Sequence, residues 1–270
     1  MRMNEIKIVE QLDRGLAYAE ACFETFRVFD GCVFQQAEHQ QRLQYGLKSY
    51  GFSCADEDVN SWFEQAMSAA SIQGNDILVR LTVSAGDADW GLLHKADERS
   101  SDVHVQVQMI LPIKPIPAHL KTVRWPFPLR EKKAKYTSDY AESLRAIQQW
   151  RCSEEKLDAP MQALICASDG NLLSTLTGNI MIYRHGQWHT PVGDGILSGV
   201  IQQFLLRNKL LVACECPVLW LDDCEAIALS NSGIFVRAAH SVNSRALDVS
   251  GSSFSIFVDA LKGCKGVPEF

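Results

Sequence analysis

Long hydrophobic runs and an excess of basic residues are both missing from this 270-residue sequence. No stretch approaches the ~20 consecutive apolar residues of a membrane-spanning helix, and residues 1–14 lack the apolar core of a secretory signal. Lysine and arginine number 26 against 32 aspartates and glutamates, which gives a net charge of -6 and indicates no basic surface for nucleic acid. We therefore expect a cytoplasmic protein that binds neither a membrane nor nucleic acid.

Closely paired metal-binding or disulfide-forming residues are also scarce. The nine cysteines include no CxxC spacing and one CxC, at Cys214 and Cys216. Reduced cysteines packed in apolar surroundings are the expected outcome. His185 and His189 are four residues apart, but a His-Gly turn between strands separates them, so they do not share a helix face and no metal site is predicted.

The composition that is present is typical of a globular protein of two domains. Hydrophobic residues make up 47% and charged residues 21%, and the length allows two ordinary cores. Pro112, Pro115 and Pro117 interrupt both helix and strand patterns within six residues. We therefore predict a smaller N-terminal domain over 1–111, a linker over 112–128 and a larger C-terminal domain over 129–270.

Hydrophobic periodicity predicts an α+β arrangement in both halves. In the first half, an Asp30-Gly31 turn joins two strands, and two helices and two further strands follow; the predicted ranges are 21–29, 32–34, helices 37–49 and 56–71, then 77–84 and 103–111. In the second half, the pattern predicts helices 138–151, 199–208 and 253–262 and strands 161–167, 179–183, 215–219 and 226–230.

The strongest motif covers residues 13–43, which read DRGLAYAEACFETFRVFDGCVFQQAEHQQRL. This stretch resembles the N-terminal signature of the fold-type IV family of pyridoxal phosphate enzymes, which includes branched-chain aminotransferases and aminodeoxychorismate lyase. The resemblance implies that Arg42, in the His-x-x-Arg-Leu part of the motif, contacts the phosphate of pyridoxal 5'-phosphate. A guanidinium suits this role because it offers a planar fork of donors to a dianion.

A second match starts at Lys135 and reads KYTSDYAESLRA. It is similar to the family's lysine followed by an Asn-Tyr or Asn-Leu pair, and it implies that Lys135 is the catalytic lysine that joins the cofactor. An amine can form an imine with the cofactor aldehyde and can then move protons as a base. The spacing to Tyr140, which the resemblance assigns to the phenolic oxygen of the cofactor, selects Lys135 over the neighbouring Lys132 and Lys133.

A third match combines GNLLSTLTGN at 170–179 with TPVGDGILSGVIQ at 190–202. It resembles the family's Gly-x-x-x-Glu segment and its Gly-Ile-Leu-x-Gly loop, which implies cofactor contacts for Asn179 and Gly199. The physical reason for the loop is independent of the resemblance: Ser198 is suited to cap the following helix. The free N–H groups of Val200 and Ile201 then make a cradle for an anion.

The fourth match, ALSNSGI at 228–234, implies that Ser232 gives its hydroxyl to the phosphate, with Asn231 as the alternative in register. Two departures from the family pattern concern function. Ser174 stands where the family carries the glutamate that pairs with the pyridine nitrogen, which predicts a weaker electron sink. The loop after strand 77–84 has Trp90 where related enzymes place an arginine, so Arg80 becomes the candidate for holding a substrate carboxylate.

Together, the four matches imply the family's fold, with two α+β domains, the cofactor between them and a homodimer. The length and the early end after the last helix resemble aminodeoxychorismate lyase more than the longer branched-chain aminotransferases. The expected activity is therefore conversion of 4-amino-4-deoxychorismate to 4-aminobenzoate and pyruvate in folate biosynthesis. Two alternatives stay open: an aminotransferase for branched-chain or D-amino acids, and a weakened or non-catalytic member of the family because of Ser174.

Overall fold

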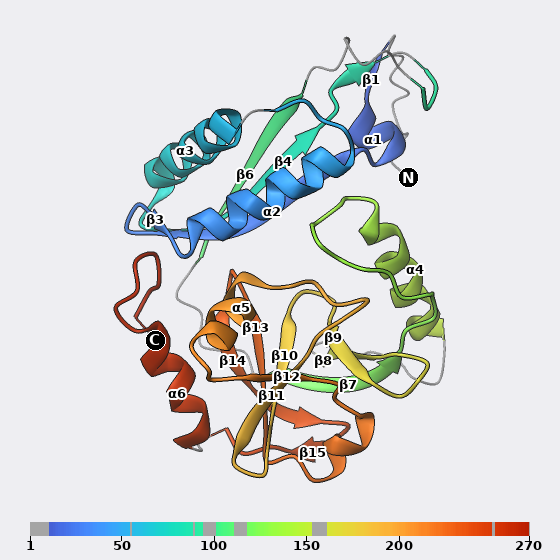
Figure 1. The fold of residues 1–270 in the computed structure, drawn as a ribbon, viewed down its shortest axis with the longest axis vertical. Helices are drawn as coiled ribbons and strands as arrows, with labels where there is room; N and C mark the ends of the chain where they lie inside the picture. The colour runs from blue at the N-terminus through green and yellow to red at the C-terminus, as the bar shows by residue number, and fades with distance from the viewer. Residues whose placement is uncertain are drawn as a thin grey trace, which may run out of the picture.

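The computed structural model describes residues 11–54, 56–88, 90–93, 101–110, 118–152, 161–249 and 252–269. These residues form two α+β units, one built on a four-stranded sheet and the other on a nine-stranded sheet (Figure 1). We call residues 11–110 the N-terminal unit and residues 118–269 the C-terminal unit. The predicted fold class is confirmed. No helix in the described part of the chain is long and apolar enough to cross a membrane.

The sheet of the N-terminal unit is antiparallel and has the order β3-β2-β4-β6. Its strands are β2 (Ala21–Phe29), β3 (Cys32–Val33), β4 (Asp76–Ser84) and β6 (Asp102–Met109). The predicted turn at Asp30 and Gly31 is confirmed, and both residues have the positive φ that this two-residue hairpin turn requires. A small pair of strands, β1 (Leu12–Asp13) and β5 (Asp87–Ala88), and helix α1 (Arg14–Tyr18) lie beyond one end of the sheet (Figure 1).

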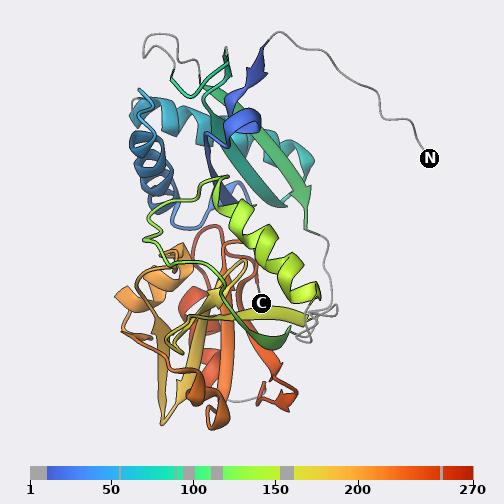
Figure 2. The same ribbon diagram turned by 90° about the vertical axis from the view of Figure 1, so that its right-hand side faces the viewer.

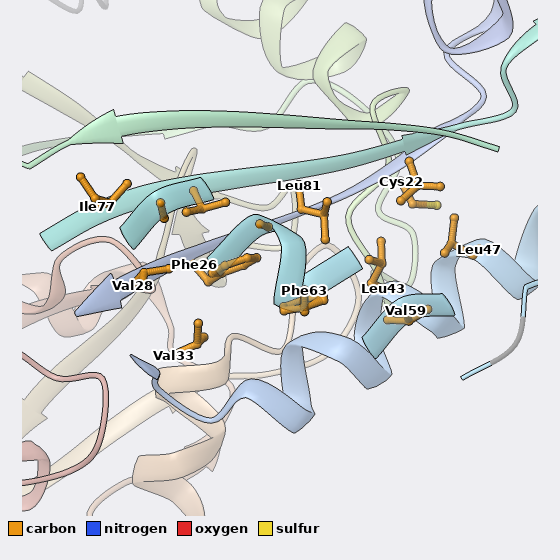
Figure 3. Close-up of a cluster of buried hydrophobic side chains, with 14 of the residues drawn as sticks. Cys22, Phe26, Val28, Val33, Leu43, Leu47, Val59, Phe63, Ile77 and Leu81 are labelled. Atoms are coloured by element: carbon orange, nitrogen blue, oxygen red, sulfur yellow. The ribbon is translucent and has the colours of Figure 1, made fainter. Parts of the chain in front are cut away.

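Helices α2 (Gln36–Ser49) and α3 (Asp56–Gln73) cover one face of this sheet (Figure 3). Alternate residues of β4 point into the core between sheet and helices, so Ile77, Val79 and Leu81 are fully buried while their neighbours face the other side. The rings of Phe26 and Phe63 stack there with centroids 4.8 Å apart. The opposite face of β2 and β4 is consequently free to border the C-terminal unit.

The sheet of the C-terminal unit has the order β12-β11-β10-β13-β14-β7-β8-β9, with β15 paired to β14. Strand β9 returns to lie beside β10, so the sheet curls into a barrel-like shape (Figures 1 and 2). The strands are β7 (Ala118–Arg124), β8 (Met161–Cys166), β9 (Leu172–Thr175), β10 (Asn179–Arg184), β11 (Gln187–Pro191), β12 (Val212–Cys214), β13 (Ala226–Asn231), β14 (Phe235–Val242) and β15 (Arg245–Ala246). Its helices are α4 (Asp139–Cys152), α5 (Val200–Arg207), the 3-10 helix η2 (Val218–Asp222) and α6 (Ser252–Leu261).

Two sequence-based assignments need correction. Residues 118–124 of the predicted linker form strand β7, which pairs with both β8 and β14; residues 112–117 lie outside the described residues. The predicted strand 215–219 is wrong, because Pro217 cannot donate to a strand ladder and η2 begins directly after it. The division into two domains at this linker otherwise stays a prediction.

Several hydrogen bonds tie the units together near the middle of the molecule. The segment around Lys135 runs beside β2, with Phe23 N–H donating to the Lys135 carbonyl at 3.0 Å and Thr137 N–H donating to the Ala21 carbonyl at 3.0 Å. From β2, Arg27 donates to the Gly233 carbonyl at 3.1 Å. Residues from distant parts of the sequence are thereby fixed around one space between the sheets.

Candidate active site

A cavity of about 400 Å³ lies between the two units. The residues predicted to hold the cofactor come from five separate stretches of sequence, yet all of them line this cavity: Arg42, Lys135, Tyr140, Ser174, Asn179, Gly199, Val200, Ile201 and Ser232. A volume of this size is typical of a site for a cofactor or a small substrate. The structure therefore brings the predicted residues together, while their individual roles stay predictions.

Lys135 presents its amine to the cavity from the segment that precedes α4. Its side chain is 19% exposed, and its Nζ lies 3.9 Å from Glu24 Oε2 and 5.7 Å from the centre of the Phe23 ring. Burial lowers the pKa of Lys135 to about 8, against the opposing effect of the Glu24 carboxylate. An amine with this pKa is partly uncharged near neutral pH, so it can act as a nucleophile and as a base.

Arg42 reaches the same cavity from α2. Its Nε and Nη2 donate to Glu24 at 2.6 and 2.8 Å, and its Nη1 donates to the Ser198 carbonyl at 3.0 Å. A guanidinium has five N–H donors, so two of them are left for a ligand. The contact with Ser198 also fixes Arg42 next to the start of α5.

The start of α5 forms a close turn against Asn179. Asn179 Nδ2 donates to the Leu197 carbonyl at 2.8 Å, and a Cβ atom on Gly199 would lie only 2.0 Å from Asn179 Oδ1. Only glycine fits there. The N–H groups of Val200 and Ile201 belong to the first turn of α5, where helices have no internal partners for their donors. The expected cap by Ser198 is not formed, because Gly199 occupies the N-cap position.

The loop after β13 offers hydroxyl groups on the neighbouring part of the wall. Asn231 Oδ1 accepts from the N–H groups of Gly233 at 2.9 Å and Ile234 at 3.0 Å, so this side chain is used to shape its own turn. That leaves Ser232 as the better of the two register alternatives for a ligand contact. Ser230 also lines the cavity, and its buried hydroxyl has no hydrogen-bond partner among the described residues.

The two residues predicted to bind substrate do not line the cavity. Arg80 lies behind the wall, with its guanidinium 3.8 Å from the Phe23 ring centre and 3.1 Å from the Tyr140 hydroxyl, to which it donates. It therefore supports the face that Phe23 and Tyr140 present. Trp90 lies beyond β5 at the far end of the N-terminal unit and is 94% exposed, so its assignment to substrate binding has no geometric support within this chain.

Among the described residues, the wall near Ser174 carries no glutamate. Asp139 is the one carboxylate among the described lining residues, and burial raises its pKa. Ser174 and Lys132 border both the main cavity and a small adjoining hollow. The acid that the family pattern places at position 174 is therefore not replaced by another acid in the described lining.

Two residues of the site were missed by the sequence analysis although they stand inside the first motif. Glu24 and His39 are 0% and 2% exposed and contact each other at 2.8 Å. The signal in the sequence is the acid itself, since Glu24 stands two residues from Cys22 and from Phe26, on the face of the strand that the apolar residues occupy. A carboxylate in such a place is rarely buried without charged partners.

Comparison with known proteins agrees with this geometry. The model of the amino-transferase class IV family matches residues 21–242. Aminodeoxychorismate lyase from Bacillus subtilis is 24% identical over 214 residues, which cover 77% of this chain and 71% of the relative.

Solved structures share the fold at lower identity. The 4-amino-4-deoxychorismate lyase of Pseudomonas aeruginosa superposes with a TM-score of 0.73 at 18% identity, over 94% of each chain. A hypothetical aminotransferase from Mycobacterium tuberculosis in its PLP-bound form gives a TM-score of 0.73 at 18% identity, over 96% of this chain and 93% of that chain. Because the family model matches most of this chain, the chain belongs to the class IV aminotransferases, enzymes of fold-type IV.

Proposed function

We propose that this enzyme is a pyridoxal phosphate-dependent lyase that converts 4-amino-4-deoxychorismate to 4-aminobenzoate and pyruvate, a step of folate biosynthesis. The observation that carries the proposal is the position of Lys135, whose amine faces a cavity with donors for an anion on the same wall. The lyase from Bacillus subtilis supports the choice of reaction. The homodimer that the resemblance implies and the cytoplasmic location that the sequence composition indicates stay predictions.

The residues of the cavity fit the cofactor at two of its ends. A phosphate would find the two unused N–H groups of Arg42, the N–H groups at the start of α5 and the hydroxyl of Ser232. In the same wall, the buried hydroxyl of Ser230 has no partner within the described part of the chain, which indicates that a polar ligand belongs there. Lys135 supplies an amine of lowered pKa for the aldehyde.

When bound, pyridoxal phosphate supplies an aldehyde that condenses with amines and a ring that withdraws electrons from the reacting carbon. Lys135 would hold that aldehyde through its amine, and the same amine is placed to remove and return protons at the substrate. Tyr140 faces the cavity from the first turn of α4, held by Arg80 and by stacking on Phe23 with centroids 5.4 Å apart. This support keeps the phenol in place for a polar group of the cofactor.

An aminotransferase acting on branched-chain or D-amino acids is the second candidate, favoured by the likeness to the aminotransferase from Mycobacterium tuberculosis. One assay separates the two. With added cofactor and aminodeoxychorismate, we expect release of 4-aminobenzoate and pyruvate in equal amounts, faster than half-transamination of a panel of L- and D-amino acids. Transamination without release of 4-aminobenzoate would decide for the aminotransferase.

Ser174→Glu is expected to speed half-transamination by roughly tenfold or more and lyase turnover by less. A serine hydroxyl cannot neutralise a protonated pyridine nitrogen, so the negative charge that develops after proton removal is poorly stabilised. Elimination of a good leaving group depends less on that stabilisation. Stopped-flow absorbance with amino acids and with aminodeoxychorismate measures both rates.

Ser143→Glu is the matched control, because Ser143 lines the same cavity from α4 and the variant adds the same charge elsewhere on the wall. It should not reproduce the acceleration. Rapid transamination by the natural protein, unimproved by Ser174→Glu, would show that another group supports the ring nitrogen. If the natural protein catalyses neither reaction and the Ser174→Glu variant catalyses one of them, the result would support a weakened or non-catalytic member of the family.

A further inference from the structure

The carboxylate of Glu24 lies directly behind the cavity wall, between Arg42 and Lys135. Both of its oxygens accept hydrogen bonds from Arg42, and Oε2 also contacts His39 Nδ1 at 2.8 Å and lies 3.9 Å from Lys135 Nζ. The side chain is fully buried. One carboxylate thus touches the guanidinium of the anion-binding wall and the amine of the predicted catalytic lysine.

A charge in this position is costly unless it is balanced. Moving a carboxylate out of water is strongly unfavourable, and only well-placed partners offset that cost. Here the positive charges of Arg42 and Lys135 hold the pKa of Glu24 well below its usual range, so the carboxylate is ionised at neutral pH. An ion pair that serves stability alone needs one cation for one carboxylate. Glu24 has two, with Arg42 on one side and Lys135 on the other.

His39 completes the arrangement as a neutral donor. Burial and the nearby cations lower the pKa of His39, so the ring is uncharged at neutral pH. Glu24 is ionised and can only accept, and therefore His39 Nδ1 carries the proton of their hydrogen bond. His39 comes from α2, three residues before Arg42, and both side chains reach the same carboxylate.

We propose that Glu24 is a positioning residue that links the two ends of the site, holding the guanidinium of Arg42 against the anion-binding wall and keeping a proton on the amine of Lys135. Its charge is shared between the two cations. A bound anion that draws Arg42 away from Glu24 would strengthen the electrostatic interaction between the Glu24 carboxylate and the Lys135 amine. This inference rests on the proposed assignment of Arg42 and Lys135 to the cofactor.

The charged groups that face Lys135 come from every element around it. Glu24 on β2 favours the ammonium form, while Arg42 on α2 and Arg80 on β4 oppose it. Lys132 and Asp139, from the segment that leads into α4, also line the cavity. Removing the charge of Glu24 leaves desolvation and two arginines without opposition, so the pKa of Lys135 should fall below about 8.

The test is competitive acetylation of the cofactor-free protein with acetic anhydride over a range of pH, followed by peptide mapping. Lys133 is the internal reference, because it is about half exposed and pairs with Glu131. In Glu24→Gln, the midpoint of the Lys135 profile is expected to move down by about one pH unit, and the ratio of Lys135 to Lys133 labelling at pH 7 to rise roughly fivefold. A loosened structure would instead expose the amine to water and move the midpoint up, toward the ordinary value of a lysine, so the direction of the shift separates the two effects.

Two further variants complete the design. Glu38→Gln removes an acid of α2 that pairs with Arg207 at the surface, and it should leave the Lys135 midpoint unchanged. Glu24→Asp keeps the charge but withdraws it by one methylene, so its midpoint should lie between those of the natural protein and Glu24→Gln. If Glu24→Gln does not fold, the midpoint of the Lys135 profile in Glu24→Asp tests the proposal by itself.

A midpoint in the Glu24 variants equal to that of the natural protein overturns the proposal, and so does an upward shift. No cofactor takes part in this measurement. Failure of pyridoxal phosphate to label Lys135 would therefore remove the proposed function without changing these ratios, and unchanged ratios would remove the role of Glu24 without touching the proposed function.

Discussion

Lys135→Ala should lose turnover of aminodeoxychorismate by about three orders of magnitude or more, since one amine performs both attachment and proton transfer. Lys133 cannot take over, because its amine pairs with Glu131 at the surface. Release of 4-aminobenzoate under excess cofactor measures the loss. Lys133→Ala is the matched control and should retain activity within about twofold, the scatter of a surface substitution.

The pH dependence of the natural protein gives a second check on the same residue. Only the uncharged amine attacks an aldehyde, and the pKa of Lys135 is about 8. Below that pH, the attachment rate of the cofactor should rise about tenfold per pH unit, and it should level off above it. A rate that keeps rising toward pH 10 would mean that the attacking lysine has an ordinary pKa and is not Lys135.

Arg42→Ala should have the second largest effect, on both cofactor affinity and stability. Loss of a charged hydrogen bond to phosphate costs about 1.5–3 kcal/mol, or roughly 10- to 150-fold in affinity. The substitution also leaves Glu24 buried with one cation fewer, and breaking such a pair costs about 3–5 kcal/mol of the free energy of unfolding. Fluorescence titration with pyridoxal phosphate and urea denaturation measure the two losses.

Two comparisons separate these effects. Arg207→Ala is the matched control, because Arg207 is half exposed at the end of α5 and pairs with Glu38. The double variant Arg42→Ala, Glu24→Gln should recover part of the stability but none of the affinity, since it removes the unpaired charge. Cofactor affinity within twofold of the natural protein in Arg42→Ala would rule out the phosphate role.

The stability loss should also depend on pH in a defined direction. Glu24 has a lowered pKa in the folded protein, so its stabilising effect is complete above its unfolded pKa of about 4 and is lost as the pH falls below that value. In Arg42→Ala, the folded pKa of Glu24 rises toward the unfolded one. The stability difference between the two proteins should therefore shrink on acidification.

Local patterns in the sequence were sufficient for most of the N-terminal unit, whereas strands β9, β11, β12, β14 and β15 of the C-terminal sheet were not predicted. The Asp30-Gly31 hairpin, helices α2 and α3 and the alternating strand β4 all follow from side-chain spacing that neighbouring residues determine. Strand β7 was missed because the prolines before it suggested a longer linker. The segment after Cys214 was assigned wrongly because its apolar residues pack through η2 rather than through a strand.

The sequence predicted those site residues that stand in a recognisable motif. It did not predict residues whose role depends on contacts that form only in the folded chain. Arg42, Lys135 and Ser232 stand in motifs, and the structure brings them to one cavity. The contact of Glu24 with Lys135 joins residues 111 positions apart, which no local pattern reveals. Trp90 shows the reverse case, because its position in the sequence pattern predicted a substrate contact but the residue does not line the cavity.

The most direct test of the central claim is to load the protein with pyridoxal phosphate, reduce it with borohydride and map the labelled peptide by mass spectrometry. The account predicts one covalent label on Lys135, with loss of the label in Lys135→Ala. A label on Lys132 or Lys133, or no label in a protein that binds the cofactor, would contradict it.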